Sequence, residues 1–386
     1  ASWGDYQTVN LTNPASISYL NNTIFDLGTE WDIHVLKSNI STDKYKSNNV
    51  VVSYINIGLP LSGKRMLKKK NALGLSFGLR PVSRIGYKIQ QDDRISGIDS
   101  VRTTFKGTGG LNQAFLGLGW KWGRFRAGFV AGYNFGNKNY STRLSLINDS
   151  VYYYKALSEN LTTFSGLSAT GGLTYEAPVG KGSLRVGAYG TYFRDMKASR
   201  SLLNETYTYD GDAGTFGQDT VSYISGQEGT VQMPRSYGGG ISWSSPHWMI
   251  GAEFEKATWS QYRYYGVQDF VQDIWKARFG MQYYPAGEST PTSRYFQFVK
   301  YRAGFYYGPD YIKLDQVRNE FAVTAGASFP LTSFQLLRRG DFVCLNTAVE
   351  MGSRGDKEST SFKENIFRFS IGVSMSARWF QKPKYD

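Results

Sequence analysis

Apolar and polar residues alternate along most of the chain with a period of two. Between residues 73 and 79, Leu and Phe hold the odd positions, and Gly and Ser hold the even ones. The same alternation recurs at 125–135, 248–254, 277–283, 301–307, 321–327 and 367–375. A period of two sends successive side chains to opposite faces of a β-strand. The pattern therefore predicts an all-β chain.

These runs define fourteen strands. They begin near residues 24, 49, 71, 104, 124, 150, 183, 231, 247, 275, 300, 316, 341 and 363. One face carries Leu, Phe, Trp and Tyr from strand to strand, and the other carries Gly, Ser, Arg and Glu. A soluble sandwich would bury the apolar face and would have no use for a glycine-rich second face. We therefore predict a closed antiparallel transmembrane β-barrel of about fourteen strands over residues 24–380, because closure removes the sheet edges that a bilayer does not tolerate.

The connections and the aromatic residues predict an orientation in the bacterial outer membrane. Tight turns near 123, 178–182 and 244–247 follow even-numbered strands and mark the periplasmic side, whereas the longest insertion, 195–230, should be extracellular. An even strand count returns both termini to the periplasm, where residues 381–386 form a tail. Two aromatic girdles are expected. The periplasmic one holds Trp120, Trp122, Trp243, Trp248 and Trp379, and the extracellular one holds Trp259, Trp275, Tyr262, Tyr264 and Tyr265.

Composition and charge narrow the class further. The chain has 43 Gly among 386 residues and 16% aromatic residues, a mixture that suits a wide sheet with aromatic rims. No run of 18 apolar residues occurs, which excludes a helical membrane protein. The net charge of +13 is dispersed, and its one dense cluster, at 64–70, fits a loop facing anionic head groups. We expect outer-membrane lipid and lipopolysaccharide as partners, and no nucleic acid.

Motifs that carry chemistry are weak. The G-x-S-x-G run at 74–78 lies inside a strand, where a nucleophile elbow cannot form. The glycine-rich stretch at 58–64 is followed by Arg65 in place of the Ser or Thr of a phosphate-binding loop. Cys344 is the only cysteine, and His34 and His247 are the only histidines. We predict no catalytic residue, no cofactor and no metal site, and therefore no enzyme.

One set of charged residues predicts a structural contact. Asp26, Glu30 and Asp32 lie on the lumen face of the first strand, together with His34. Closure of the barrel places the last strand beside the first. We therefore expect Arg368 and Arg378 to pair with these carboxylates across the closure.

An ordered set of short motifs spans nearly the whole sequence. These motifs are Asn-Pro-Ala-Ser at 13–16, the run at 77–87, Gly-Gly-Leu-Asn at 109–112, Pro-Arg-Ser-Tyr-Gly at 234–238, Trp-Ser-Gln-Tyr at 259–262 and the end at 378–386. In this set of motifs the chain resembles the FadL-like outer-membrane proteins of the type found in Bacteroidetes.

This resemblance implies an N-terminal segment that folds into the lumen as a hatch. Residues 1–23 would be what remains of that hatch, with Asn13, Pro14 and Ala15 as its motif and Pro14 fixing a bend. In relatives that carry long-chain fatty acids, the hatch blocks the pore and the substrate leaves sideways through a gap in the wall. The resemblance favours passive passage of small hydrophobic molecules such as fatty acids.

A second function stays open. PorV-like relatives are bound subunits of larger outer-membrane machines for secretion or barrel assembly. The alternative is therefore a non-catalytic accessory subunit whose partners are other outer-membrane proteins or lipoproteins.

Overall fold

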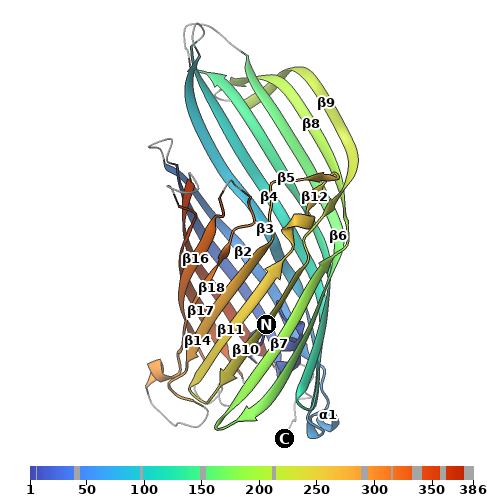
Figure 1. Ribbon diagram of the computed structural model, residues 1–386, viewed down its shortest axis with the longest axis vertical. Helices are drawn as coiled ribbons and strands as arrows, with labels where there is room; N and C mark the ends of the chain where they lie inside the picture. Colours follow the sequence, from blue (N-terminus) through green and yellow to red (C-terminus); the bar gives the residue numbers. More distant parts are fainter. Residues whose placement is uncertain are drawn as a thin grey trace, which may run out of the picture.

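A closed antiparallel sheet forms the wall of the molecule (Figure 1). The computed structural model describes residues 1–5, 7–38, 44–95, 99–147, 154–210, 214–287, 294–313, 316–332, 341–356 and 362–377. The fourteen wall strands are β1 (Thr23–Ser38), β2 (Lys44–Pro60), β3 (Asn71–Ile95), β4 (Asp99–Trp122), β5 (Phe125–Leu146), β6 (Lys155–Val179), β7 (Gly182–Phe193), β10 (Ser236–Ser244), β11 (Trp248–Ala257), β14 (Ile274–Tyr283), β15 (Lys300–Pro309), β16 (Asn319–Pro330), β17 (Val343–Arg354) and β18 (Phe362–Ala377). The predicted fourteen-stranded barrel is confirmed.

Pairing of the first and last strands closes the barrel. The ladder between β1 and β18 runs without a shift from Thr23↔Ala377 to Ser38↔Phe362. Every neighbouring pair in the wall is antiparallel, as expected when short connections link successive strands.

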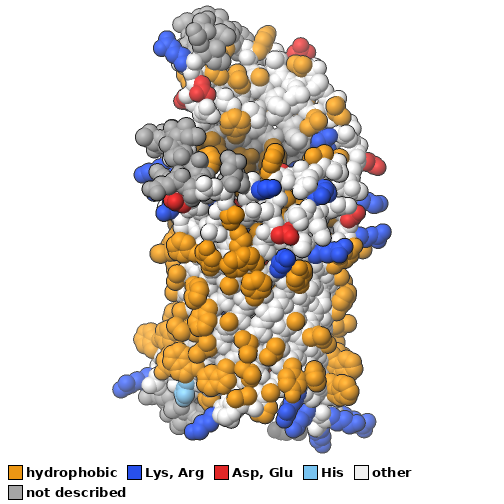
Figure 2. All heavy atoms as spheres, in the orientation of Figure 1, with side chains coloured by type: hydrophobic (Ala, Val, Ile, Leu, Met, Phe, Trp, Pro, Cys, Tyr) orange, Lys and Arg blue, Asp and Glu red, His pale blue; other side chains and the backbone are white. Residues whose placement is uncertain are grey.

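The apolar face of the sheet points outward. On β5, the side chains of Phe125, Phe129 and Tyr133 are 63%, 55% and 51% exposed, whereas those of Val130 and Asn134 between them are buried. On the face seen in Figure 2, hydrophobic side chains gather in a band over the lower part of the barrel. An exposed apolar surface of this extent marks contact with lipid.

Residues of the predicted girdles divide into two groups. Trp122, Trp248 and Trp275 are exposed on the outer wall, at 71%, 41% and 40%. Four others belong to a crossing segment that contains η2 (Trp259–Gln261), β12 (Arg263–Tyr264) and β13 (Val267–Gln268). Its three tyrosines, Tyr262, Tyr264 and Tyr265, pack inward against the buried cluster Leu111, Met196, Ala198 and Val231. The prediction that these tyrosines face the membrane interface is wrong, because the segment crosses the mouth of the barrel. Trp379 lies outside the described residues.

One half of the wall is much taller than the other. Strands β3 and β6 each have 25 residues, whereas β10 has 9. At about 3.3 Å per residue, a 25-residue strand is roughly 80 Å long, far more than an apolar band of about 25 Å requires even when tilted. The tall half includes β8 (Met196–Asp210) and β9 (Gly214–Gln232), a hairpin that continues the wall along β6 (Figure 1).

The predicted insertion at 195–230 is therefore a β-hairpin and not an irregular loop. Residues 216–228 of β9 are exposed on both faces, so the sequence carries no alternation there. We call the end with this hairpin the tall end.

The opposite end carries the short turns, and we call it the short-turn end. Gly123 and Gly180 adopt φ of +60° in two of its turns, a conformation that favours glycine. Helix α1 (Lys64–Lys68) and η3 (Tyr295–Gln297) lie in its two longer connections. In the described part of the chain, no helix has the length and apolar character needed to cross a bilayer.

Candidate functional site

The N-terminal segment, residues 1–22, lies inside the barrel at the short-turn end. Its helical turn η1 (Pro14–Tyr19) packs against β3, β4, β5 and β6. The side-chain oxygen of Asn13 accepts a hydrogen bond from the backbone N–H of Ala15 at 3.1 Å, and Pro14 occupies the first position, where a missing N–H costs nothing. The Asn13 amide also donates to the Leu173 carbonyl at 3.2 Å. The motif thus starts the turn and ties it to the wall.

A row of glycines on the lumen face lets η1 approach the wall backbone. Gly74, Gly119, Gly128 and Gly172 are consecutive partners across β3, β4, β5 and β6. A Cβ atom on Gly128 would lie 2.1 Å from the Pro14 carbonyl carbon, and one on Gly119 would lie 2.6 Å from the Ser18 nitrogen. Any side chain there would displace the turn. The glycine-rich inner face is therefore shaped to hold the N-terminal segment.

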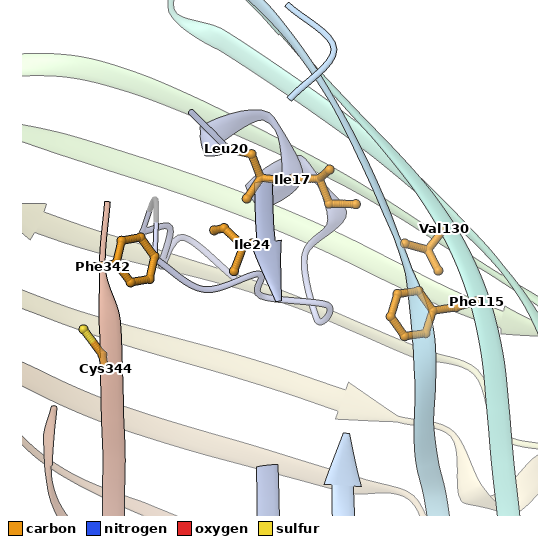
Figure 3. Packing of buried hydrophobic residues seen from close by; sticks show 7 residues of the cluster. All are labelled: Ile17, Leu20, Ile24, Phe115, Val130, Phe342 and Cys344. Carbon is orange, nitrogen blue, oxygen red and sulfur yellow. The ribbon is translucent and has the colours of Figure 1, made fainter. Parts of the chain in front are cut away.

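An apolar cluster inside the lumen holds the same segment (Figure 3). It joins Ile17 and Leu20 of the N-terminal segment to wall residues at the start of β1 and on other strands, and consists of Ile17, Leu20, Ile24, Phe115, Val130, Phe342 and Cys344. Ile17 and Ile24 are fully buried, and Leu20 is 3% exposed. Burial of each such side chain is worth about 1.5–3 kcal/mol. Apolar burial thus favours the docked segment by several kcal/mol.

Charged groups add anchors at the short-turn end. The Tyr19 ring lies 3.5 Å from the Arg126 guanidinium and 4.9 Å from that of Arg185, and both arginines pair with Glu176. Lys300 pairs with Asp5 at 3.0 Å. Burial opposes ionisation of Asp5, but Lys300 and Arg302 outweigh it and hold its pKa below the ordinary value.

A cavity of about 440 Å³ lies in the lumen beside the N-terminal segment. Small residues of β14 to β18 and of β1 form most of its wall, and Trp3 contributes from the N-terminal segment. Tyr54, Glu30 and Arg302 supply polar groups. Its volume is within the range of small-molecule pockets.

The wall beside this cavity is split between β2 and β3. Their ladder runs only from Pro60↔Gly74 to Ile55↔Leu79, although both strands continue toward the tall end. Side chains bridge the seam beyond that point. Arg84 donates to the Val52 carbonyl at 3.2 Å and contacts Glu30 at 3.0 Å. Higher up, the Ser47 hydroxyl and the Asn49 amide donate to the Gly86 carbonyl. Bridges made by side chains alone open more easily than a backbone ladder.

Charged residues cross the barrel closure as well. Asp32 and Arg368 are direct partners in the β1–β18 ladder, and their side chains form an ion pair. Arg368 also lies 3.8 Å from Glu30 and 3.3 Å from Glu350. Asp26 is not brought to an arginine by this network; it accepts hydrogen bonds from the Ser374 and Tyr54 hydroxyls. Arg378 lies outside the described residues.

The two histidines have ordinary partners. His34 Nδ1 lies 2.8 Å from Glu364 Oε1 on the lumen side, and His247 Nδ1 lies 3.1 Å from the Tyr284 carbonyl in an exposed turn. Within the described ranges, no group of three His, Cys, Asp or Glu side chains could hold a metal ion.

Solved structures with the same fold are outer-membrane channels. The Pseudomonas putida toluene transporter TodX aligns with 97% of this chain and 95% of its own, at 15% identity and a TM-score of 0.58. A FadL homologue of Pseudomonas aeruginosa covers 95% and 93% at 12% identity and a TM-score of 0.56. The Ralstonia pickettii toluene transporter TbuX covers 94% and 92% at 14% identity and a TM-score of 0.55.

The closed wall, the outer apolar belt and these neighbours define an outer-membrane β-barrel with the fold of the FadL-like channels. A family model named BamG matches residues 2–386, and the chain belongs to the BamG family. No curated protein gives a significant match to the sequence.

Proposed function

We propose that the protein passively passes small hydrophobic molecules, such as fatty acids or monoaromatic compounds, across the outer membrane and catalyses no reaction. The observation that carries this proposal is the seam between β2 and β3 beside a lumen cavity. Glu30 and Tyr54 line the cavity, and Glu30 also contacts Arg84 in the seam. A molecule in the cavity therefore has a side exit within reach once the Arg84 bridges open.

The proposed orientation places the short-turn end in the periplasm and the tall end outside the cell. Short turns and long outer extensions are the general arrangement of outer-membrane barrels. Both chain termini, including the tail at 381–386, would then be periplasmic. A hatch made by residues 1–23 would close the periplasmic half of a barrel formed by 24–380.

The mouth of the seam has an apolar outer surface, which suits a hydrophobic substrate. The side chains of Val50, Val52 and Val82 are 75%, 51% and 36% exposed there. A hydrophobic molecule leaving the seam would meet apolar side chains and then lipid, so it would not need to re-enter water.

The test is uptake of labelled toluene and labelled oleate by cells that make the protein. We expect faster uptake than in cells with an empty vector. An Arg84→Met variant keeps the bulk of the side chain but loses the bridges across the seam, and it should raise the rate of uptake. Uptake equal to the empty-vector rate for both probes would contradict the proposal.

A second candidate is the accessory subunit of a multi-protein outer-membrane complex. The docked N-terminal segment is compatible with both roles, because it narrows the lumen in either. The BamG match is in keeping with the accessory role. Purification from native membranes in a gentle detergent, followed by mass spectrometry, discriminates the two. Partners at a fixed ratio would favour the accessory role, and a lone barrel would count against it.

A further inference from the structure

A cleft opens in the wall where two strands are interrupted. β7 ends at Phe193 and β8 begins at Met196, while the neighbouring β9 ends at Gln232 and β10 begins at Ser236. The cleft has a volume of about 330 Å³. It is lined by Tyr192, Phe193, Asp195, Gln232, Met233, Arg235, Gln261 and Arg263.

This cleft lies at the tall-end border of the apolar belt. Tyr192 and Tyr237 of the outer wall are each 49% exposed, and Gln232 and Arg235 follow immediately above them. Lys and Arg side chains gather along this border of the belt (Figure 2). In the orientation proposed above, this is the level of the head groups of the outer leaflet.

The cations at this border differ from those inside the barrel. Most lumen arginines, those at 84, 126, 185, 278, 318, 354 and 368, form ion pairs with carboxylates. Arg80 and Arg302 donate instead to the side-chain oxygens of Gln113 and Gln282. Among the described residues, no carboxylate lies within ion-pair distance of Arg194, Arg235, Lys256 or Arg263. The described part of the protein therefore does not neutralise these four positive charges, and an anionic ligand could.

Asp195 also lines the cleft and accepts a hydrogen bond from the Gln232 amide at 3.3 Å, but among the described side chains it forms no ion pair with Arg235 or Arg263. Both arginines are held in place by other contacts. The Arg235 guanidinium lies 5.2 Å from the centre of the Tyr192 ring, and Arg263 donates to the carbonyls of Ser260 and Tyr262 at 2.7 and 2.8 Å. The other N–H groups of both guanidiniums can serve a ligand. Guanidinium groups bind phosphate in two-point hydrogen bonds, and basic pockets at a membrane interface bind lipid head groups.

We propose that this cleft binds a phosphate-bearing glycolipid of the outer leaflet, with its phosphate on Arg235 and Arg263 and its acyl chains along the apolar wall below Tyr192. The site would be separate from the passage route, which uses the lumen and the seam between β2 and β3. It would fix the barrel in the asymmetric membrane at the point where β7 ends and β10 begins.

The test measures binding of diphosphorylated lipid A to the full chain in detergent by native mass spectrometry. We expect wild-type protein to retain lipid A, and lipid A without phosphates to bind at least about tenfold more weakly, since charge-assisted hydrogen bonds are lost. Arg235→Gln should show a similar loss. It is the cleaner variant because the Arg235 side chain makes no hydrogen bond that holds η2 or β12. Arg124→Gln, in an exposed turn at the opposite end, is the matched control and should bind as wild type does.

Three results would overturn the proposal. Arg235→Gln could retain lipid A as wild type does while its heat-modifiable gel band shows a folded barrel. Inorganic phosphate at millimolar concentration could displace lipid A completely, which would assign the cleft to a free anion. An acidic protein could copurify with the wild-type barrel and be absent from Arg235→Gln, while the amount of bound lipid A stays the same in both. None of these results depends on whether the barrel transports a hydrophobic substrate.

Discussion

A single methyl group on the lumen wall should loosen the N-terminal segment. In Gly128→Ala, the new Cβ would lie 2.1 Å from the Pro14 carbonyl carbon and 2.4 Å from the Ala15 nitrogen, and both are backbone atoms that cannot rotate away. Overpacking of this kind costs about 1–3 kcal/mol. Because about 1.4 kcal/mol is a factor of ten, the released state should become about 5- to 150-fold more populated.

The native cysteine provides the assay. Cys344 is the only cysteine in the sequence, and its side chain is buried in the apolar cluster with Ile17, Leu20 and Ile24. A small hydrophilic thiol reagent should reach it only when the segment leaves, so the labelling rate follows the released population. Gly128→Ala should therefore label about 5- to 150-fold faster than wild type.

A neighbouring glycine supplies the control. A Cβ on Gly171, which faces the opposite side of the sheet, would meet nothing within 4 Å. Gly171→Ala should label at the wild-type rate. Equal rates for wild type, Gly128→Ala and Gly171→Ala, in barrels that all remain folded, would refute the packing argument.

Three further results are expected. Arg368→Glu places a negative charge opposite Asp32 and should lower the temperature at which the folded gel band disappears, because a part-buried ion pair becomes a repulsion. The ion pair of Asp5 with Lys300 stabilises the docked segment fully at pH values above the ordinary Asp pKa of 3.8, and this stabilisation is lost as pH falls through the lowered pKa of Asp5. Pepsin should therefore cleave the released segment only below that pH, and Asp5→Asn should remove the pH dependence of cleavage. Arg84→Met should raise uptake of labelled toluene if the bridges across the seam limit exit, and an unchanged rate would assign them no gating role.

The barrel itself could be predicted from sequence because the wall strands obey period two. The start of β3 at Asn71, of β15 at Lys300 and of β18 at Phe362 fall within one residue of the predicted positions. Lipid outside and small or polar groups inside impose a strict alternation on every spanning strand. In the β8–β9 hairpin, residues 216–228 of β9 have solvent on both faces, which removes that alternation, and the hairpin was missed.

The lumen contacts could be predicted only in part. Asp32 and Arg368 lie on the first and last strands, so closure alone brings them together. The seam between β2 and β3 leaves no such signal, since the point where their ladder stops depends on how two strands lie and not on a motif in either. The glycine row was visible as composition, but its partner η1 is fixed by contacts between residues more than 50 positions apart in the sequence.

The passage route is tested most directly by locking the seam. A Cβ on Gly86 would lie 3.2 Å from the Asn49 side-chain carbon, close enough for a disulfide between Asn49→Cys and Gly86→Cys in a chain that also carries Cys344→Ser. Our account predicts that uptake of labelled toluene falls to the empty-vector rate when this pair is oxidised and recovers when it is reduced. Uptake that is the same in the oxidised and reduced protein would contradict the route through the seam.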